Sequence, residues 1–155
     1  MSPILDDGLA LPKLASLPLE TYEAGSLVLA AGATTGKLLV LKEGAVEVVR
    51  DGVRLAEVSE PGAVFGELAA LLGRPHTADV RALRRSTFHV ADGESYLRAD
   101  PIAALYVAIL LAGRLQAVNR HLVEARTRLG QAPPAGVVAE MIDNIALTLR
   151  YGPPL

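Results

Sequence analysis

Residues 46–58, Val46-Glu-Val-Val-Arg-Asp-Gly-Val-Arg-Leu-Ala-Glu-Val58, contain two short runs rich in valine around a central Asp-Gly pair. An Asp-Gly pair readily adopts the positive φ angles that a two-residue hairpin turn requires. The stretch therefore predicts two antiparallel strands that are joined at Asp51-Gly52.

Similar turn signals continue on both sides of this hairpin. They separate short Val- and Leu-rich runs between residues 24 and 90, at Ala24-Gly25, Ala31-Gly32, Glu43-Gly44 and Pro61-Gly62. Turns at such intervals indicate a sandwich or barrel of short antiparallel strands.

Helical segments interrupt and follow this β region. Glu67–Leu72 is a run of good helix formers that ends at Gly73, whereas Asp92-Gly93 is interpreted as a further turn at the end of the β region. Asp100-Pro101 predicts the start of a long helix, because Asp caps free N–H groups and Pro fits the first helical position.

The long helix carries an apolar stripe with the alternating spacing of a helix pair. Its members are Leu111, Leu115, Val118, Leu122, Ala125 and Leu129. The spacing favours a homodimer through residues 111–129. The alternative is that the stripe packs on the barrel of its own chain.

The remainder of the chain gives the expected domain organisation. Residues 1–21 form a helical lead-in interrupted by prolines, and residues 22–129 form the main domain with its long helix. Residues 130–155 form a linker and one amphipathic helix, whose apolar residues are Val138, Met141, Ile142, Ile145 and Leu149.

Composition excludes several function classes. The 155 residues are 51% hydrophobic, carry a formal net charge of −2 and include no cysteine. This argues against electrostatic attraction to nucleic acid and removes thiol chemistry. The longest uncharged apolar runs are 13 residues, and the N-terminus lacks a secretory signal. We therefore expect a cytoplasmic protein with no membrane span.

The stretch from Val64 to Val80 has the order of residues expected of a phosphate cradle. Gly66 has no side chain to block a ligand, and the short helix after it presents unpaired N–H groups. Glu67 supplies an acceptor that suits a sugar hydroxyl better than a phosphate oxygen. Phosphate and ribose together indicate a nucleotide. The alternative is an ordinary strand-to-helix turn in which Glu67 only favours the helix start.

Here the sequence resembles the cyclic nucleotide-binding domain of catabolite activator proteins, kinase regulatory subunits and gated channels. The resemblance extends from about residue 22 to residue 126. Its motifs are Tyr22-Glu-Ala-Gly25, Gly32, Leu41-Lys-Glu-Gly-Ala-Val-Glu-Val48, Pro61-Gly-Ala-Val-Phe-Gly-Glu-Leu-Ala69 and Gly113-Arg-Leu-Gln. It implies a mainly β fold with flanking helices: an eight-stranded jelly-roll (double-stranded β-helix) barrel with N-terminal and C-terminal helices.

The resemblance also implies the site. Phe65, Gly66, Glu67 and Leu68 match the family's cassette, in which the glycine and helix amides meet the cyclic phosphate and the glutamate meets the ribose. The expected ligand is cAMP or cGMP. Thr77 and Asn119 occupy positions that contact ligand in some members, and Thr77 leaves the choice between the two purines open.

The chain departs from the family where an arginine normally binds the phosphate, because His76 follows Pro75. Loss of that contact is expected to weaken binding about tenfold to over a hundredfold. A protonated His76 or the nearby Arg74 are the candidate replacements. Asp79, where Thr or Ser is common, is expected to place a negative charge near the pocket.

These observations predict a signal-transducing regulatory module that binds a cyclic nucleotide and changes its C-terminal helices in response. The alternative is a degenerate domain that serves protein–protein contact without nucleotide. We expect no catalytic residues, no metal site and no sequence-specific DNA binding, because the chain lacks nucleophile and metal motifs and has no room for a winged helix-turn-helix after residue 130. The protein partner is not identified by the sequence.

Overall fold

The computed structural model describes residues 14–128 and residue 140. The chain divides into two compact units between Ile109 and Leu110, inside one long helix. Each unit is considered separately below.

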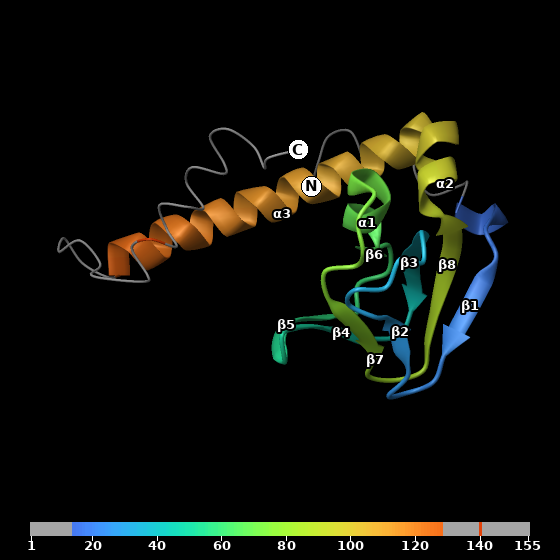
Figure 1. Cartoon of the computed structure of the whole chain (residues 1–155), viewed down its shortest axis with the longest axis horizontal. Coiled ribbons are helices and arrows are strands. Elements are labelled where there is room, and N and C mark those ends of the chain that lie inside the picture. The colour runs from blue at the N-terminus through green and yellow to red at the C-terminus, as the bar shows by residue number, and fades with distance from the viewer. Residues whose placement is uncertain (1–13, 129–139, 141–155) are drawn as a thin grey trace. The chain divides into compact units, whose positions relative to one another are not determined.

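The first unit contains two four-stranded antiparallel sheets (Figure 1). One has the order β1-β8-β3-β6, formed by β1 (Leu19–Tyr22), β8 (Ser86–Asp92), β3 (Lys37–Glu43) and β6 (Val64–Phe65). The other has the order β2-β7-β4-β5, formed by β2 (Leu27–Leu29), β7 (Asp79–Ala82), β4 (Val46–Arg50) and β5 (Val53–Val58). The predicted eight-stranded jelly roll is therefore confirmed.

The hydrophobic core draws residues from both sheets. Phe88 lies at its centre with no exposed surface, and its ring meets Tyr22 and Phe65 edge to face at centroid distances of 5.8 and 6.1 Å. Aliphatic side chains fill the rest: Val28, Leu29, Leu39, Leu41, Val46, Val80, Ala82 and Val90. Branched residues thus supply most of the core, in keeping with the low aromatic content.

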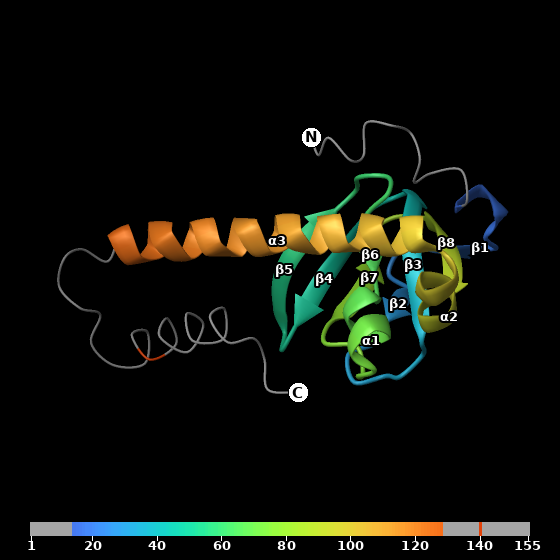
Figure 2. The same ribbon diagram turned by 90° about the horizontal axis from the view of Figure 1, so that it is seen from above.

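The predicted hairpin is present as β4 and β5. Asp51 and Gly52 have φ angles of 51° and 77°, as a turn with two positive φ angles requires. The pairing shifts between Val48 and Val49, which marks a bulge. β5 lies at the edge of its sheet (Figure 2), and Val53 and Leu55 are each 60% exposed.

Two helices and a 3₁₀ turn flank the sheets. The turn is η1 (Leu14–Ser16), and α1 (Glu67–Leu72) ends as predicted at Gly73, whose φ is 60°. The interpretation of Asp92-Gly93 as a simple turn is wrong, because α2 (Gly93–Ala99) begins there. Asp92 caps this helix by accepting a hydrogen bond from the Ser95 N–H at 3.0 Å.

The long helix α3 (Pro101–Arg128) begins at the predicted position. Asp100 Oδ1 accepts hydrogen bonds from the N–H groups of Ile102 at 3.0 Å and Ala103 at 3.3 Å. In the first unit the helix buries Ala103 and Val107.

By length and composition alone, α3 is apolar enough to cross a membrane. Residues 101–127 include an 18-residue window with a mean hydropathy of 1.7, of which 11% is buried. Counting uncharged runs missed this property, because Arg114 interrupts an otherwise apolar stretch. Such a helix is weak evidence for a membrane span, since helices of soluble proteins pass the same test.

Candidate functional site

The cassette begins where β6 meets α1. Gly66 has a φ of 84°, and a Cβ there would overlap the carbonyl oxygen of Lys37 on β3. Both the backbone angle and the close approach therefore require glycine at this position. The chain can turn from strand to helix here without a side chain covering the turn.

Glu67, the first residue of α1, is the buried carboxylate of the cassette, with 4% of its surface exposed. Its two neighbours in the cassette differ in how deeply they are buried. Phe65 belongs to the core, whereas Leu68 is 41% exposed. Of the four matching residues, Gly66 and Glu67 thus supply the polar part of the site. Phe65 fixes the start of the cassette to the hydrophobic core.

His76 closes the far end of the cassette. It is 6% exposed, and a hydrogen bond of 2.7 Å joins its Nε2 to Thr35 Oγ1. Its backbone N–H donates to the Ala33 carbonyl at 2.9 Å, and its carbonyl accepts from the Gly32 N–H at 2.8 Å. His76 therefore ties the cassette to the loop between β2 and β3.

Burial determines the charge state of this histidine. Burial lowers the pKa of His76 below its ordinary value of 6.5, although the negative charge of Glu67 acts in the opposite direction. The imidazole is therefore predominantly neutral at pH 7. This weakens the sequence-based hypothesis that a protonated His76 replaces the phosphate-binding arginine.

The other candidates in this segment lie at the surface. Arg74 and Thr77 are both exposed. Asp79 Oδ1 accepts a hydrogen bond of 2.7 Å from the Ala31 N–H. The negative charge expected near the pocket is therefore engaged with the β2–β3 loop.

Sequence reasoning missed the part played by this loop. Thr35 reaches His76 across a separation of 41 residues, and Ala31 reaches Asp79 across 48. No local motif marks either contact, because each joins two segments that are far apart in the sequence and meet only in the folded chain. Only the fold reveals that the cassette and this loop form one structure.

Asn119 lies on the exposed surface of α3, in the second unit. Its predicted role at the base of the ligand stays a prediction.

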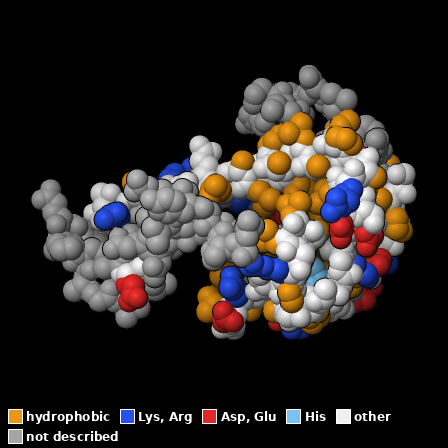
Figure 3. All heavy atoms as spheres, turned by 45° about the horizontal axis from the view of Figure 1, so that its top comes forward, with side chains coloured by type: hydrophobic (Ala, Val, Ile, Leu, Met, Phe, Trp, Pro, Cys, Tyr) orange, Lys and Arg blue, Asp and Glu red, His pale blue; other side chains and the backbone are white. Residues whose placement is uncertain are grey.

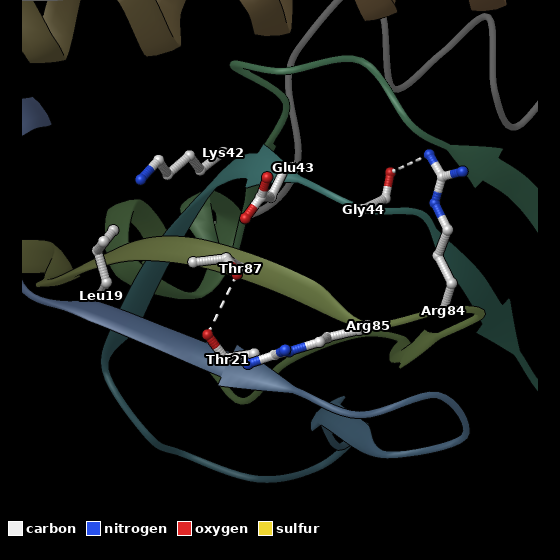
Figure 4. A pocket seen from close by; sticks show the side chains of 8 residues that line it. All are labelled: Leu19, Thr21, Lys42, Glu43, Gly44, Arg84, Arg85 and Thr87. Carbon is white, nitrogen blue, oxygen red and sulfur yellow. Dashed lines mark hydrogen bonds between the residues drawn. The ribbon is translucent and has the colours of Figure 1, made fainter.

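The surface of the first unit has two further features. Hydrophobic side chains gather on the face that carries α1 and the first turns of α3 (Figure 3), including the exposed Leu68, Leu71, Leu72 and Leu105. An open pocket of about 670 Å³ lies between β1 and the turns that follow β3 and β7 (Figure 4). None of the residues that line this pocket belongs to the cassette.

Both arginines and both threonines of that pocket have partners. Arg84 donates to the Gly44 carbonyl at 3.0 Å, and Thr21 and Thr87 share a hydrogen bond (Figure 4). Arg85 lies 3.4 Å from a Glu23 oxygen. Among residues 14–128 and 140, no group of three His, Cys, Asp or Glu side chains has the arrangement of a metal site. The cassette remains the better candidate for ligand binding.

A family model described as "Cyclic nucleotide-binding domain" matches residues 19–99. This match contains both sheets, the cassette and α2, and it covers about half of the chain. The chain belongs to the cyclic nucleotide-binding domain family.

Known relatives of this cyclic nucleotide-binding domain are longer proteins. A cAMP-dependent protein kinase regulatory subunit of Yarrowia lipolytica is 33% identical over 146 residues, which are 88% of this chain and 39% of the relative. Glutaminase 2 of Bradyrhizobium diazoefficiens is 42% identical over 109 residues, which are 63% of this chain and 17% of the relative. The chain thus spans less than half the length of either protein.

The fold of this domain has close counterparts among solved structures. The catabolite activator protein of Thermus thermophilus superposes with a TM-score of 0.66 and 27% identity, over 81% of this chain and 63% of that one. The family is one of regulatory domains.

Proposed function

We propose that this chain is the sensing module of a regulatory protein, and that its cassette binds a cyclic purine nucleotide, cAMP or cGMP. The observation that carries the proposal is the pairing of Gly66 in a left-handed conformation with a buried Glu67 at the start of α1. A carboxylate buried beside an open backbone turn suits the free 2′-hydroxyl of the ribose in a cyclic nucleotide, because it accepts a hydrogen bond from that group.

The proposed signal passes from the cassette to the C-terminal helices. Tyr106 Oη on the first part of α3 donates a hydrogen bond of 2.8 Å to the Gly62 carbonyl, in the turn that leads into β6. β6 in turn leads directly into Gly66. A ligand that moves the cassette would thus change the setting of α3 and of the residues that follow it.

The contact between α1 and α2 supports a second route for the proposed signal from the cassette to α3. A Cβ on Gly93 would lie 2.6 Å from the Cβ of Ala70, so the two helices touch without room for a side chain. The Gly93 N–H also donates to the Gly36 carbonyl at 2.8 Å. A shift of α1 would therefore be transmitted to α2, which immediately precedes α3.

We also propose where the module acts and what it binds besides the nucleotide. It acts in the cytoplasm without catalytic activity of its own, forms a homodimer through residues 111–129 and passes its signal to a protein partner. It neither reads DNA sequence nor inserts into a membrane. The exposure of Leu115 and Val118, at 48% and 52%, supports an interface on α3.

One observation favours a second function. The ring of His76 is buried and bonded to Thr35 where the family carries a phosphate-binding arginine. A cassette closed by its own hydrogen bonds is compatible with a domain that has lost its ligand. Such a domain would serve protein–protein contact through the apolar face around α1.

Titration calorimetry with cAMP and cGMP separates these functions. We expect binding at ligand concentrations below 1 mM, and at least a tenfold loss of affinity in Glu67→Gln, because a hydrogen bond to a charged acceptor is worth about 1.5–3 kcal/mol. Glu94→Gln is the matched control, since Glu94 is exposed on α2 and pairs with Arg98. A folded protein that binds neither nucleotide at millimolar concentration would contradict the proposal that the cassette binds a cyclic nucleotide.

A further inference from the structure

The charge of the cassette differs from what a phosphate diester requires. Between Val64 and Val80, Arg74 is the one arginine or lysine, and its side chain is exposed. The two buried ionisable side chains of this stretch are Glu67 and His76. Residues 64–80 therefore contribute no buried Lys or Arg.

Lys37 does not supply the missing charge. Its carbonyl oxygen faces Gly66, but its Nζ lies 3.0 Å from both carboxylate oxygens of Glu20. The ammonium group is thus held by β1.

His76 is fixed as a neutral hydrogen-bonding group. Its ring lies close to Gly66, so that a Cβ on the glycine would be 3.4 Å from His76 Cε1. Its Nε2 is bonded to Thr35 Oγ1 at 2.7 Å. Burial lowers the pKa of this imidazole, and the titratable group that faces it is Glu67. At neutral pH His76 therefore brings no positive charge to the cassette.

We propose that this cassette selects an uncharged purine ribonucleoside over the matching 3′,5′-cyclic nucleotide. The inference rests on the proposed function, because it assigns the same site the same ribose and purine contacts. Glu67 can accept a hydrogen bond from the ribose 2′-hydroxyl of either ligand. The cyclic phosphate, however, brings a negative charge beside Glu67 and finds no buried Lys or Arg among residues 14–127.

The nucleoside suits the groups that are present. Its free 3′ and 5′ hydroxyls can each donate and accept a hydrogen bond, which a neutral imidazole and a backbone turn can satisfy. His76 is then the residue that determines specificity. An arginine in its place would restore the charge-assisted bonds that a phosphate needs.

Calorimetry on the full chain at pH 7.5 tests the inference with two ligand pairs: adenosine with cAMP and guanosine with cGMP. In at least one pair we expect the nucleoside to bind about tenfold tighter or more than the cyclic nucleotide. In His76→Arg we expect the order to reverse. Arg98→Ala, on the exposed face of α2, is the control and should keep the preference of the unmodified chain.

The outcomes distinguish this inference from the proposed function. Tighter binding of the cyclic nucleotide in both pairs overturns the inference and leaves the proposed function in place. Nucleoside binding without detectable cyclic nucleotide binding supports the inference and removes cAMP and cGMP as ligands.

Two further outcomes contradict the inference. The absence of binding by all four compounds overturns the inference and the proposed function together. A selective loss of cyclic nucleotide affinity in Arg74→Ala would show that Arg74 supplies the missing cation. The unmodified chain decides between the ligand classes even where His76→Arg does not fold.

Discussion

A buried histidine, His76, and a partly buried one, His89, are expected to make the stability of this domain depend on pH. Burial lowers the pKa of His76, and burial together with the charge of Lys42 lowers the pKa of His89, both from 6.5. The folded state then binds fewer protons than the unfolded state as pH falls below about 6.5. Stability conferred by the neutral rings is complete above that pH and is lost as pH falls towards the folded pKa values.

Urea denaturation at pH 7.5 and pH 5.5 measures this effect. We expect the free energy of unfolding to be lower at pH 5.5, and the difference to shrink in His76→Gln and in His89→Gln. The latter change is informative because His89 Nδ1 is buried without a hydrogen-bond partner in the described structure. Equal stability at both pH values in the unmodified chain would contradict the prediction.

Ser86 is a second residue whose removal should be costly. It is fully buried, and its Oγ accepts from the Ala45 N–H at 3.1 Å and contacts the carbonyl oxygens of Ala45 and Arg84. Ser86→Ala removes these hydrogen bonds from a buried site, so we expect a loss of about 1–3 kcal/mol. Ser59→Ala, at an exposed position, should change the free energy of unfolding by less than about 0.5 kcal/mol in the same urea experiment.

At the scale of single elements, the β4–β5 hairpin depends on its turn. Gly52 has a φ of 77° with no atom near enough to clash with a Cβ, so Gly52→Ala isolates the cost of the backbone angle. We expect a loss of about 1–2 kcal/mol. Asp51→Gly is the matched change at the neighbouring positive φ and should be close to neutral. A neutral Gly52→Ala in thermal or urea denaturation would contradict the prediction.

The hairpin also shows what the sequence can predict. Asp51-Gly52, Gly73 and Asp100-Pro101 each act through their own backbone, so local chemistry predicted the turn, the helix end and the helix start. α2 was missed because Asp92-Gly93 favours a turn and a helix cap alike. Only the hydrogen bond from the Ser95 N–H to the Asp92 carboxylate distinguishes the cap from the turn.

The candidate site could be predicted only in part for the same reason. Gly66 and Glu67 are recognisable in a continuous motif. The bond between His76 and Thr35, and that between Asp79 and Ala31, join residues that are adjacent only after the sheets have formed. Burial of His76, which sets its charge, is likewise a property of the folded chain.

At the scale of the whole molecule, the apolar stripe on α3 predicts a dimer. Leu115 and Val118 are about half exposed, which is unusual for two neighbouring members of an apolar stripe. We expect light scattering to give the mass of a dimer for the unmodified chain and that of a monomer for Leu115→Glu combined with Val118→Glu.

Gln116→Glu is the control for this experiment, because position 116 faces away from the stripe in the heptad pattern. It adds a charge to the same turn and should leave the dimer intact. A monomeric unmodified chain would indicate that the stripe meets another surface.

The row of three rings formed by Tyr22, Phe88 and Phe65 has an experimental use. The chain contains no tryptophan, so aromatic circular dichroism in the near ultraviolet comes from tyrosine and phenylalanine alone. Phe65 immediately precedes Gly66, and its ring meets Phe88 at an interplanar angle of 81°. The optical activity of these coupled rings is therefore expected to report, without a label, on the packing of the core directly beside the cassette.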